Sequence, residues 1–114
     1  MSIALTTAQA LDLMRRVTVA GVKRPTADLT ARQLAVLLTV YMSAPPHTVR
    51  GLAKLLGLSK PAVTRALDRL GRLDLARRKR EEADRRSVQV QRTVKGSVYL
   101  SELADEIVAA GKGV

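Results

Sequence analysis

The stretch LSKPAVTRALDRL, residues 58–70, decides the fold. Ser59 is a residue type that caps helix starts, and Pro61 follows within the first helical turn, where its missing N–H costs nothing. Apolar side chains then recur at helical spacing, at Val63, Leu67 and Leu70. The stretch therefore predicts a short helix with a fixed start, one buried side and cations elsewhere around it.

A second short helix is predicted just before this one, joined to it by GLS. Thr48 can cap its start, and Gly57 follows its end, where a left-handed residue is favoured. Arg50 and Lys54 are expected to lie outside the buried face of this helix. The side chains expected to be buried are Val49, Leu52, Ala53 and Leu56. Two such helices are typical of a helix-turn-helix, although an ordinary helical hairpin shares the pattern.

Capping boxes predict two further helices upstream. Thr6 with Gln9 starts one that runs to about Gly21 and carries more apolar surface than one core needs. Thr30 with Gln33 starts the other, which ends before Pro45-Pro46. Its predicted buried face consists of Leu34, Leu37, Leu38 and Tyr41.

Downstream of Asp74 the segments LARRKR, EEADRR and SVQVQRT predict a strand, a charged turn and a second strand. Val88 and Val90 alternate with glutamines on the second strand. A last helix is expected from Thr93 to about Gly111. Its predicted apolar side consists of Tyr99, Leu100, Leu103, Ile107 and Ala110.

The composition excludes several classes of site. The 114 residues suit one domain and are 46% apolar, with no Cys, one His and two aromatic residues. Thiol chemistry, zinc–thiolate sites and aromatic stacking on bases are therefore not expected. His47 beside Pro45-Pro46 is predicted to be a loop residue, and we expect no enzyme activity, metal or cofactor. The chain contains no membrane-length apolar run and no basic leader, so we expect a cytoplasmic, nucleoid-associated protein.

Charge is segregated along the chain. Residues 50–95 carry fourteen Lys or Arg and five Asp or Glu, a net charge of +9, whereas the whole chain carries +10. Such a local basic field favours a polyanionic partner. The alternative is a basic surface that serves only solubility.

The segment DRRSVQVQRTVKG, residues 84–96, resembles the wing pattern of the MarR family of bacterial regulators. The matching positions are Asp84, Arg86, Val90, Thr93 and Gly96. Residues 58–70 likewise resemble the family's recognition helix, and the resemblance covers about residues 30–100. Arg92 stands where the family usually has Leu, and Asp74 stands where a Gly usually ends the recognition helix. Family members usually continue into a further C-terminal helix, whereas this chain stops after one.

The resemblance implies an α+β, mainly helical fold: a winged helix-turn-helix with flanking N- and C-terminal helices. Residues 1–114 would form a single winged-helix DNA-binding domain, with the winged-helix core at 30–93. The helices at 6–21 and 94–111 would form a homodimer, mainly through residues 3–21 and 97–110. The implied function is sequence-specific binding of double-stranded DNA and regulation of transcription, with the recognition helix in the major groove and the wing in the minor groove.

Twelve residues are the candidate DNA contacts: Arg50, Lys54, Ser59, Lys60, Ala62, Thr64, Arg65, Arg69, Lys79, Asp84, Arg85 and Arg86. Lys60, Thr64 and Arg65 would read base edges, and Ala62 would lie against a thymine methyl. Ser59 and the helix N-terminus would hold a phosphate. Simple phosphate attraction is the alternative for Lys60 and Arg65.

The resemblance places Arg86 in the minor groove, with Asp84 fixing the loop or only balancing nearby arginines. Phosphate contacts are expected for Arg85 and Lys79 in the wing region. Arg50 and Lys54 should also meet phosphates. For Asp68 and Arg69 a structural or wing-orienting pair is favoured over base contact.

Two other functions fit the same residues. A low-specificity architectural protein of the nucleoid type would bind DNA mostly by charge. A winged-helix module could instead act with a protein partner, such as a component of the transcription machinery. The scarcity of aromatic residues argues against a small-molecule effector, so no ligand is expected.

Overall fold

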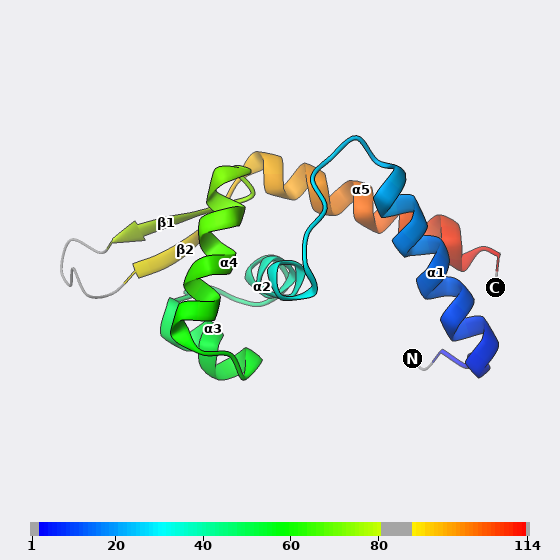
Figure 1. The fold of residues 1–114 in the computed structure, drawn as a ribbon, viewed down its shortest axis with the longest axis horizontal. Coiled ribbons are helices and arrows are strands. Elements are labelled where there is room, and N and C mark those ends of the chain that lie inside the picture. The colour runs from blue at the N-terminus through cyan, green and yellow to red at the C-terminus, as the bar shows by residue number, and fades with distance from the viewer. Residues whose placement is uncertain (1–2, 81–87, 114) are drawn as a thin grey trace. The chain divides into compact units, whose positions relative to one another are not determined.

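A computed structural model describes residues 3–80 and 88–113. Its elements, in chain order, are α1 (Thr7–Lys23), α2 (Ala31–Met42), α3 (Val49–Leu56), α4 (Lys60–Arg72), β1 (Ala76–Arg80), β2 (Val88–Arg92) and α5 (Val94–Gly111), as Figure 1 shows. The chain forms two compact units, one from residues 1–28 with 100–114 and one from residues 29–99. The predicted α+β, mainly helical class is confirmed.

The second unit is a winged helix. Helices α2, α3 and α4 pack against one another, and the two strands form an antiparallel hairpin. Its register pairs Ala76 with Arg92 at the base and Arg80 with Val88 at the outer end. The order helix, turn, helix and hairpin confirms the predicted winged helix-turn-helix.

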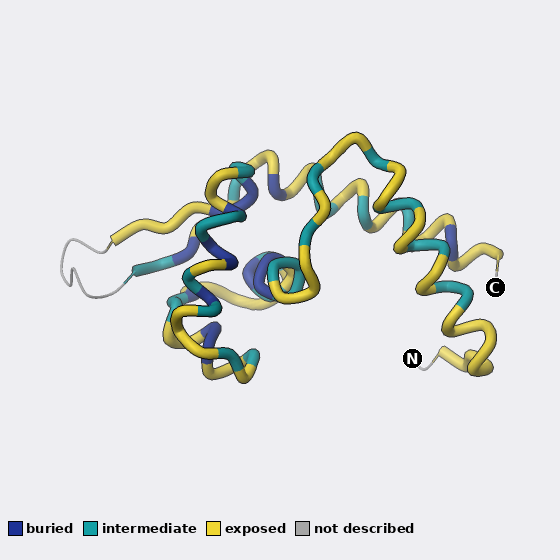
Figure 2. The backbone as a smooth tube through the Cα atoms, in the orientation of Figure 1, coloured by how far each residue is buried: buried dark blue, intermediate teal, exposed yellow. Residues whose placement is uncertain are grey.

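The core of this unit lies where the three helices meet, as the buried segments in Figure 2 show. Its buried side chains are Val36, Leu37, Val40, Leu52, Ala53, Val63, Ala66, Leu67, Leu70, Leu75, Ala76 and Val90. The buried face predicted for α2 was partly wrong, because Leu38 is exposed and Leu34 and Tyr41 are only half-buried. The face that packs on α3 and α4 is centred on Val36, Leu37 and Val40, and Leu38 projects from another side of the helix.

Tyr41 joins three segments at the base of the wing. Its hydroxyl donates to the carbonyl of Leu75 at 2.7 Å and accepts from the N–H of Thr93 at 2.8 Å. Thr93 Oγ1 donates to the carbonyl of Asp74 at 2.7 Å and accepts from the N–H of Gly96 at 2.9 Å. The end of α2, the start of β1 and the start of α5 are therefore fixed together.

Asp74 makes the turn between α4 and β1. Its φ is 57°, in the left-handed region that Asp tolerates better than most residues. The N–H groups of Asp74 and Leu75 donate to the carbonyls of Gly71 and Leu70, which satisfies the end of α4. The backbone can therefore turn here without the usual Gly.

The first unit consists of α1, the segment that follows it and the C-terminal part of α5 (Figure 1). The capping box of Thr6 and Gln9 is present, but α1 continues past the predicted end at Gly21 to Lys23. The helix stops because Arg24, which precedes Pro25, is extended at ψ 141°. Arg24 Nε lies 3.2 Å from Glu106 Oε1, an ion pair whose side chains are 12% and 18% exposed.

Much of the apolar surface of the first unit faces solvent. No residue of α1 is buried, and Ile107, which was predicted to pack, is 45% exposed. The other large exposed side chains of this unit include Ile3, Leu11, Met14, Val22 and Val108. On the polar side of α1, a hydrogen bond from Arg15, with help from Arg16, lowers the pKa of the Asp12 carboxyl. None of the helices in the described ranges is long and apolar enough to cross a membrane.

Gly96→Ala should destabilise the second unit. A methyl group at Gly96 would overlap the Tyr41 hydroxyl and the carbonyl of Leu75, and the backbone carbonyl cannot move away as a flexible side chain would. We expect a loss of roughly 1–3 kcal/mol in the free energy of unfolding, measured by urea denaturation. Gly21→Ala is the control, because a Cβ there meets no atom within 4 Å. It should stabilise α1 by about 0.5–1 kcal/mol, and equal effects of the two changes would contradict the steric argument.

Candidate nucleic-acid interface

Local hydrogen bonds fix the start of both helices of the helix-turn-helix. The N–H of Gly51 donates to Thr48 Oγ1 at 3.0 Å, and the N–H of Ala62 donates to Ser59 Oγ at 3.2 Å. Between the helices, Gly57 is left-handed with φ 65°. These three features agree with the sequence prediction, and they set the point at which α4 begins.

Helix α4 presents its cations away from the core. The buried side consists of Val63, Ala66, Leu67 and Leu70. Lys60 and Arg65, in the first half of the helix, are exposed, whereas Ala62, Thr64 and Arg69 are half-buried. The N-terminal half of α4 therefore offers two cations with a small side chain and a hydroxyl near them.

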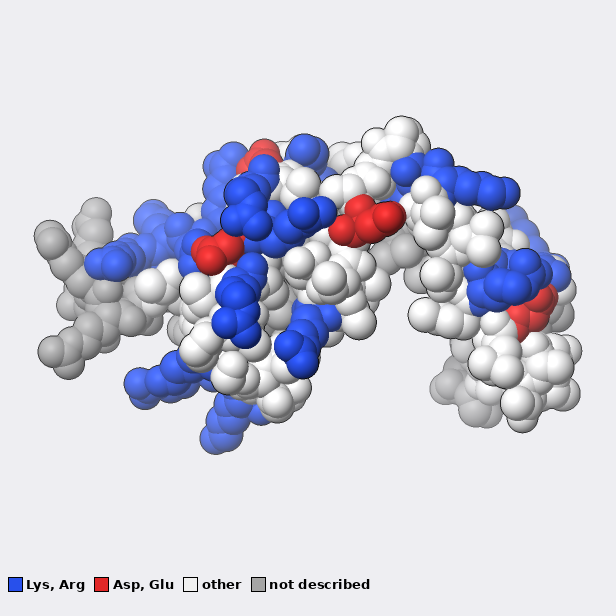
Figure 3. Space-filling model, in the orientation of Figure 1, with Lys and Arg blue, Asp and Glu red and all other residues white. Residues whose placement is uncertain are grey.

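Cations of other elements add to this surface. Arg50 and Lys54 are exposed one turn apart on α3, and Lys79 is exposed on β1. Figure 3 shows Lys and Arg gathered over α3, α4 and β1 with few acidic side chains among them. Nine of the twelve predicted DNA contacts thus lie on described residues of the second unit. The other three, Asp84, Arg85 and Arg86, lie outside the described residues.

One ion pair joins α4 to the wing. Arg78 Nη2 on β1 donates to Asp68 Oδ1 on α4, and the two side chains are 36% and 42% exposed. Asp68 therefore contacts the wing through Arg78, a residue that sequence reasoning did not single out. The sequence signal was weak, since Arg78 is one of several cations in LARRKR and its partner is ten residues away.

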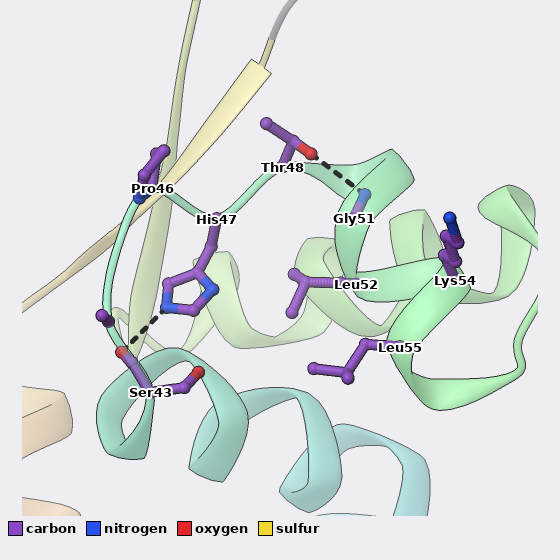
Figure 4. A pocket seen from close by; sticks show the side chains of 9 residues that line it. Ser43, Pro46, His47, Thr48, Gly51, Leu52, Lys54 and Leu55 are labelled. Atoms are coloured by element: carbon purple, nitrogen blue, oxygen red, sulfur yellow. Dashed lines mark hydrogen bonds between the residues drawn. The ribbon is translucent and has the colours of Figure 1, made fainter.

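A hollow of about 570 Å³ lies between the end of α2 and α3 (Figure 4). Its lining residues are Ser43, Ala44, Pro46, His47, Thr48, Gly51, Leu52, Lys54 and Leu55. His47 lies between the two helices, as predicted for a loop residue, but is only 9% exposed, and its Nε2 is 3.1 Å from the carbonyl of Ser43. The lining contains no carboxylate or thiol, and the described residues contain no group of His, Cys, Asp and Glu suited to a metal ion.

Comparisons with known proteins give one family. The family model described as MarR family matches residues 27–87, which include α2, α3, α4 and β1. No curated protein matches the chain.

Solved structures share the fold. YusO from Bacillus subtilis is 24% identical over 93% of this chain and 70% of that chain, with a TM-score of 0.68. BpsR from Bordetella bronchiseptica, whose DNA binding is regulated by 6-hydroxynicotinic acid, is 22% identical over 93% of this chain and 80% of that one, with a TM-score of 0.66. CouR, a transcriptional repressor solved on a 23-mer DNA duplex, is 25% identical over 93% of this chain and 69% of that one, with a TM-score of 0.70.

Substitutions of Ser59 should distinguish the stability that comes from the capping hydrogen bond of α4 from the effect of a negative charge at the same position. Ser59→Ala removes the acceptor of the Ala62 N–H and should cost about 1 kcal/mol of unfolding free energy, whereas Ser59→Gly should cost only a few tenths. Ser59→Asp keeps an acceptor at the positive end of the helix and should be at least as stable as the wild type. Urea denaturation measures all three, and an unchanged midpoint for Ser59→Ala would show that the cap contributes nothing.

Proposed function

The chain belongs to the MarR family of DNA-binding transcriptional regulators, and from this premise we propose that it binds specific sequences of double-stranded DNA as a homodimer. The observation that carries the proposal is the start of α4. The Ser59 cap fixes that start, and Lys60 and Arg65 are exposed beside it. In helix-turn-helix proteins the N-terminal residues of the second helix contact base edges in the major groove.

In the proposed complex, Lys60, Thr64 and Arg65 read base edges, and Ala62 lies against a thymine methyl. Ser59 and the first N–H groups of α4 hold a phosphate. The phosphate contacts of the described set are Arg50, Lys54 and Lys79, whereas Arg69, next to Asp68, takes a structural or wing-orienting role. The wing lies along the minor groove, where Arg86 enters and Asp84 holds the loop, while Arg85 meets a phosphate.

Two features support a homodimer. Dimers are typical of this family, and the first unit exposes apolar side chains on both of its helices, including Leu11 and Met14 on α1 and Ile107 and Val108 on α5. An apolar surface of this kind on a monomer marks an interaction site. A second copy of the chain is the proposed occupant, so that α1 and α5 pair and each copy carries one winged helix.

Electrostatics would contribute most of the affinity. If the complex neutralises about 6–10 phosphates, affinity should fall roughly 10³–10⁵-fold between 50 and 200 mM salt. A low-specificity architectural protein would show the same salt dependence. Preference between sequences, not salt dependence, therefore discriminates the two functions.

Selection from a random DNA pool at physiological salt tests the function. We expect an enriched palindrome with half-sites about one helical turn apart, because two copies related by twofold symmetry present two α4 helices. A single half-site would contradict the dimer, and sedimentation of the free protein checks this independently. Retained binding without an enriched motif would support the architectural alternative. No binding would support a module that acts with a protein partner.

Arg65→Ala tests base reading. On the selected site, the variant should lose about 1–3 kcal/mol of discrimination against mismatched DNA, since a bidentate contact to guanine contributes that much. Arg15→Ala removes the same charge from α1 and should leave discrimination unchanged. The measurement is binding to the selected duplex and to a scrambled one. An equal loss on both duplexes would make Arg65 a phosphate contact.

A further inference from the structure

Arg92 reaches from the end of β2 to the C-terminal end of α2. Its Nε donates to the carbonyl of Val40 at 3.0 Å, and its Nη2 donates to the carbonyl of Ser43, also at 3.0 Å. The guanidinium carbon lies 5.8 Å from the centre of the Tyr41 ring. One side chain thus contacts three residues at the end of another element.

The end of α2 suits a cation. The last carbonyls of an α-helix have no partner within the helix, and they carry the negative end of the helix dipole. Helix α2 contains no basic residue in its own last turn. Arg92 therefore supplies, from the wing, the positive charge and the donors that α2 lacks.

A second set of contacts holds β2 to the segment after α2. The N–H of Val90 donates to the carbonyl of His47 at 2.8 Å, and Thr48 forms a bridge with Gln89. His47 in turn directs its ring toward the carbonyl of Ser43, which Arg92 also contacts (Figure 4). Strand β2 is thus held to residues 43–48 at Gln89 and Val90 and again at Arg92.

The other strand is held to α4 by the pair of Arg78 and Asp68. Because Arg78 pairs with Val90 in the hairpin, the contacts of the two strands act on the same short ribbon. A two-stranded ribbon has little stability of its own, so its direction depends on such contacts. The direction of β1, and with it the place of Lys79, depends on contacts at both strands.

We infer that Arg92 is a positioning residue for DNA binding. By holding β2 to the end of α2, it sets the direction of the wing relative to α4 and places Lys79 against a phosphate. The inference rests on the proposed DNA-binding function. Arg92 acts through the wing and needs no DNA contact of its own.

A double-mutant cycle tests this role. The variants are Arg92→Leu, Lys79→Ala and their combination, with Arg50→Ala as the matched control, because Arg50 is an exposed cation on a different element, α3. Affinity for the duplex recovered from the random pool is measured across a salt series. If the pool gives no motif but DNA still binds, one mixed-sequence duplex replaces it.

In the wild type, Lys79→Ala and Arg50→Ala should each reduce the steepness of log affinity against log salt by about 2, because each copy in the proposed dimer loses one phosphate contact. In the Arg92→Leu background, Lys79→Ala should leave the steepness unchanged, whereas Arg50→Ala should still reduce it by about 2. A merely structural role would leave both effects additive, and that result would overturn the inference. No binding by the wild type would instead overturn the proposed function.

Arg92→Lys separates position from charge. A lysine keeps the charge, but one ammonium group cannot reproduce the planar pair of donors that meets two carbonyls. We therefore expect that in the Arg92→Lys background, as in Arg92→Leu, Lys79→Ala leaves the salt dependence of binding unchanged. Wild-type coupling in Arg92→Lys would overturn the positioning role. Thermal unfolding of each variant checks that the second unit remains folded during the binding measurements.

Discussion

The hydroxyl of Tyr41 is the interaction on which the second unit depends. It bonds to the carbonyl of Leu75, which lies 34 positions after Tyr41 in the chain, and to the N–H of Thr93, which lies 52 positions after it. A partly buried backbone group without a partner is costly, so these bonds hold the segments together more strongly than their net energy suggests. Gly96 packs against the same hydroxyl, and the approach is so close that a larger residue would displace it.

This constraint determines where the proposed DNA-binding elements lie. Because Leu75 follows α4 directly, holding its carbonyl also holds the C-terminal end of α4, while the Ser59 cap and Gly57 define the other end. Thr93 follows β2, so the same hydroxyl fixes the base of the wing. The Tyr41 hydroxyl therefore fixes both the C-terminal end of α4 and the base of the hairpin. The contacts of Arg78 and Arg92 then set the direction of the hairpin.

Local chemistry made much of this fold predictable. The capping residues Thr6, Thr30 and Ser59 and the left-handed Gly57 act within a few residues, so the sequence alone locates those helix ends. The errors and omissions concern contacts between elements that are separated in the sequence. Leu38 and Ile107 are exposed because burial depends on which neighbour packs on the helix, and no local pattern states that. Likewise the partners of Arg78 and Arg92 lie in other elements, so sequence proximity could not reveal them.

The same distinction limits what net charge says about DNA contacts. Residues 50–95 carry a net +9, which drew attention to this segment. Yet Arg77 pairs with Asp74, Arg78 pairs with Asp68, and Arg92 is bonded to two carbonyls of the protein. A guanidinium held by the protein is oriented by that contact and has fewer N–H groups left to donate to a phosphate. The net charge therefore counts arginines that are already bonded to the protein together with those that are not, and the second kind should contribute most directly to the salt dependence of binding.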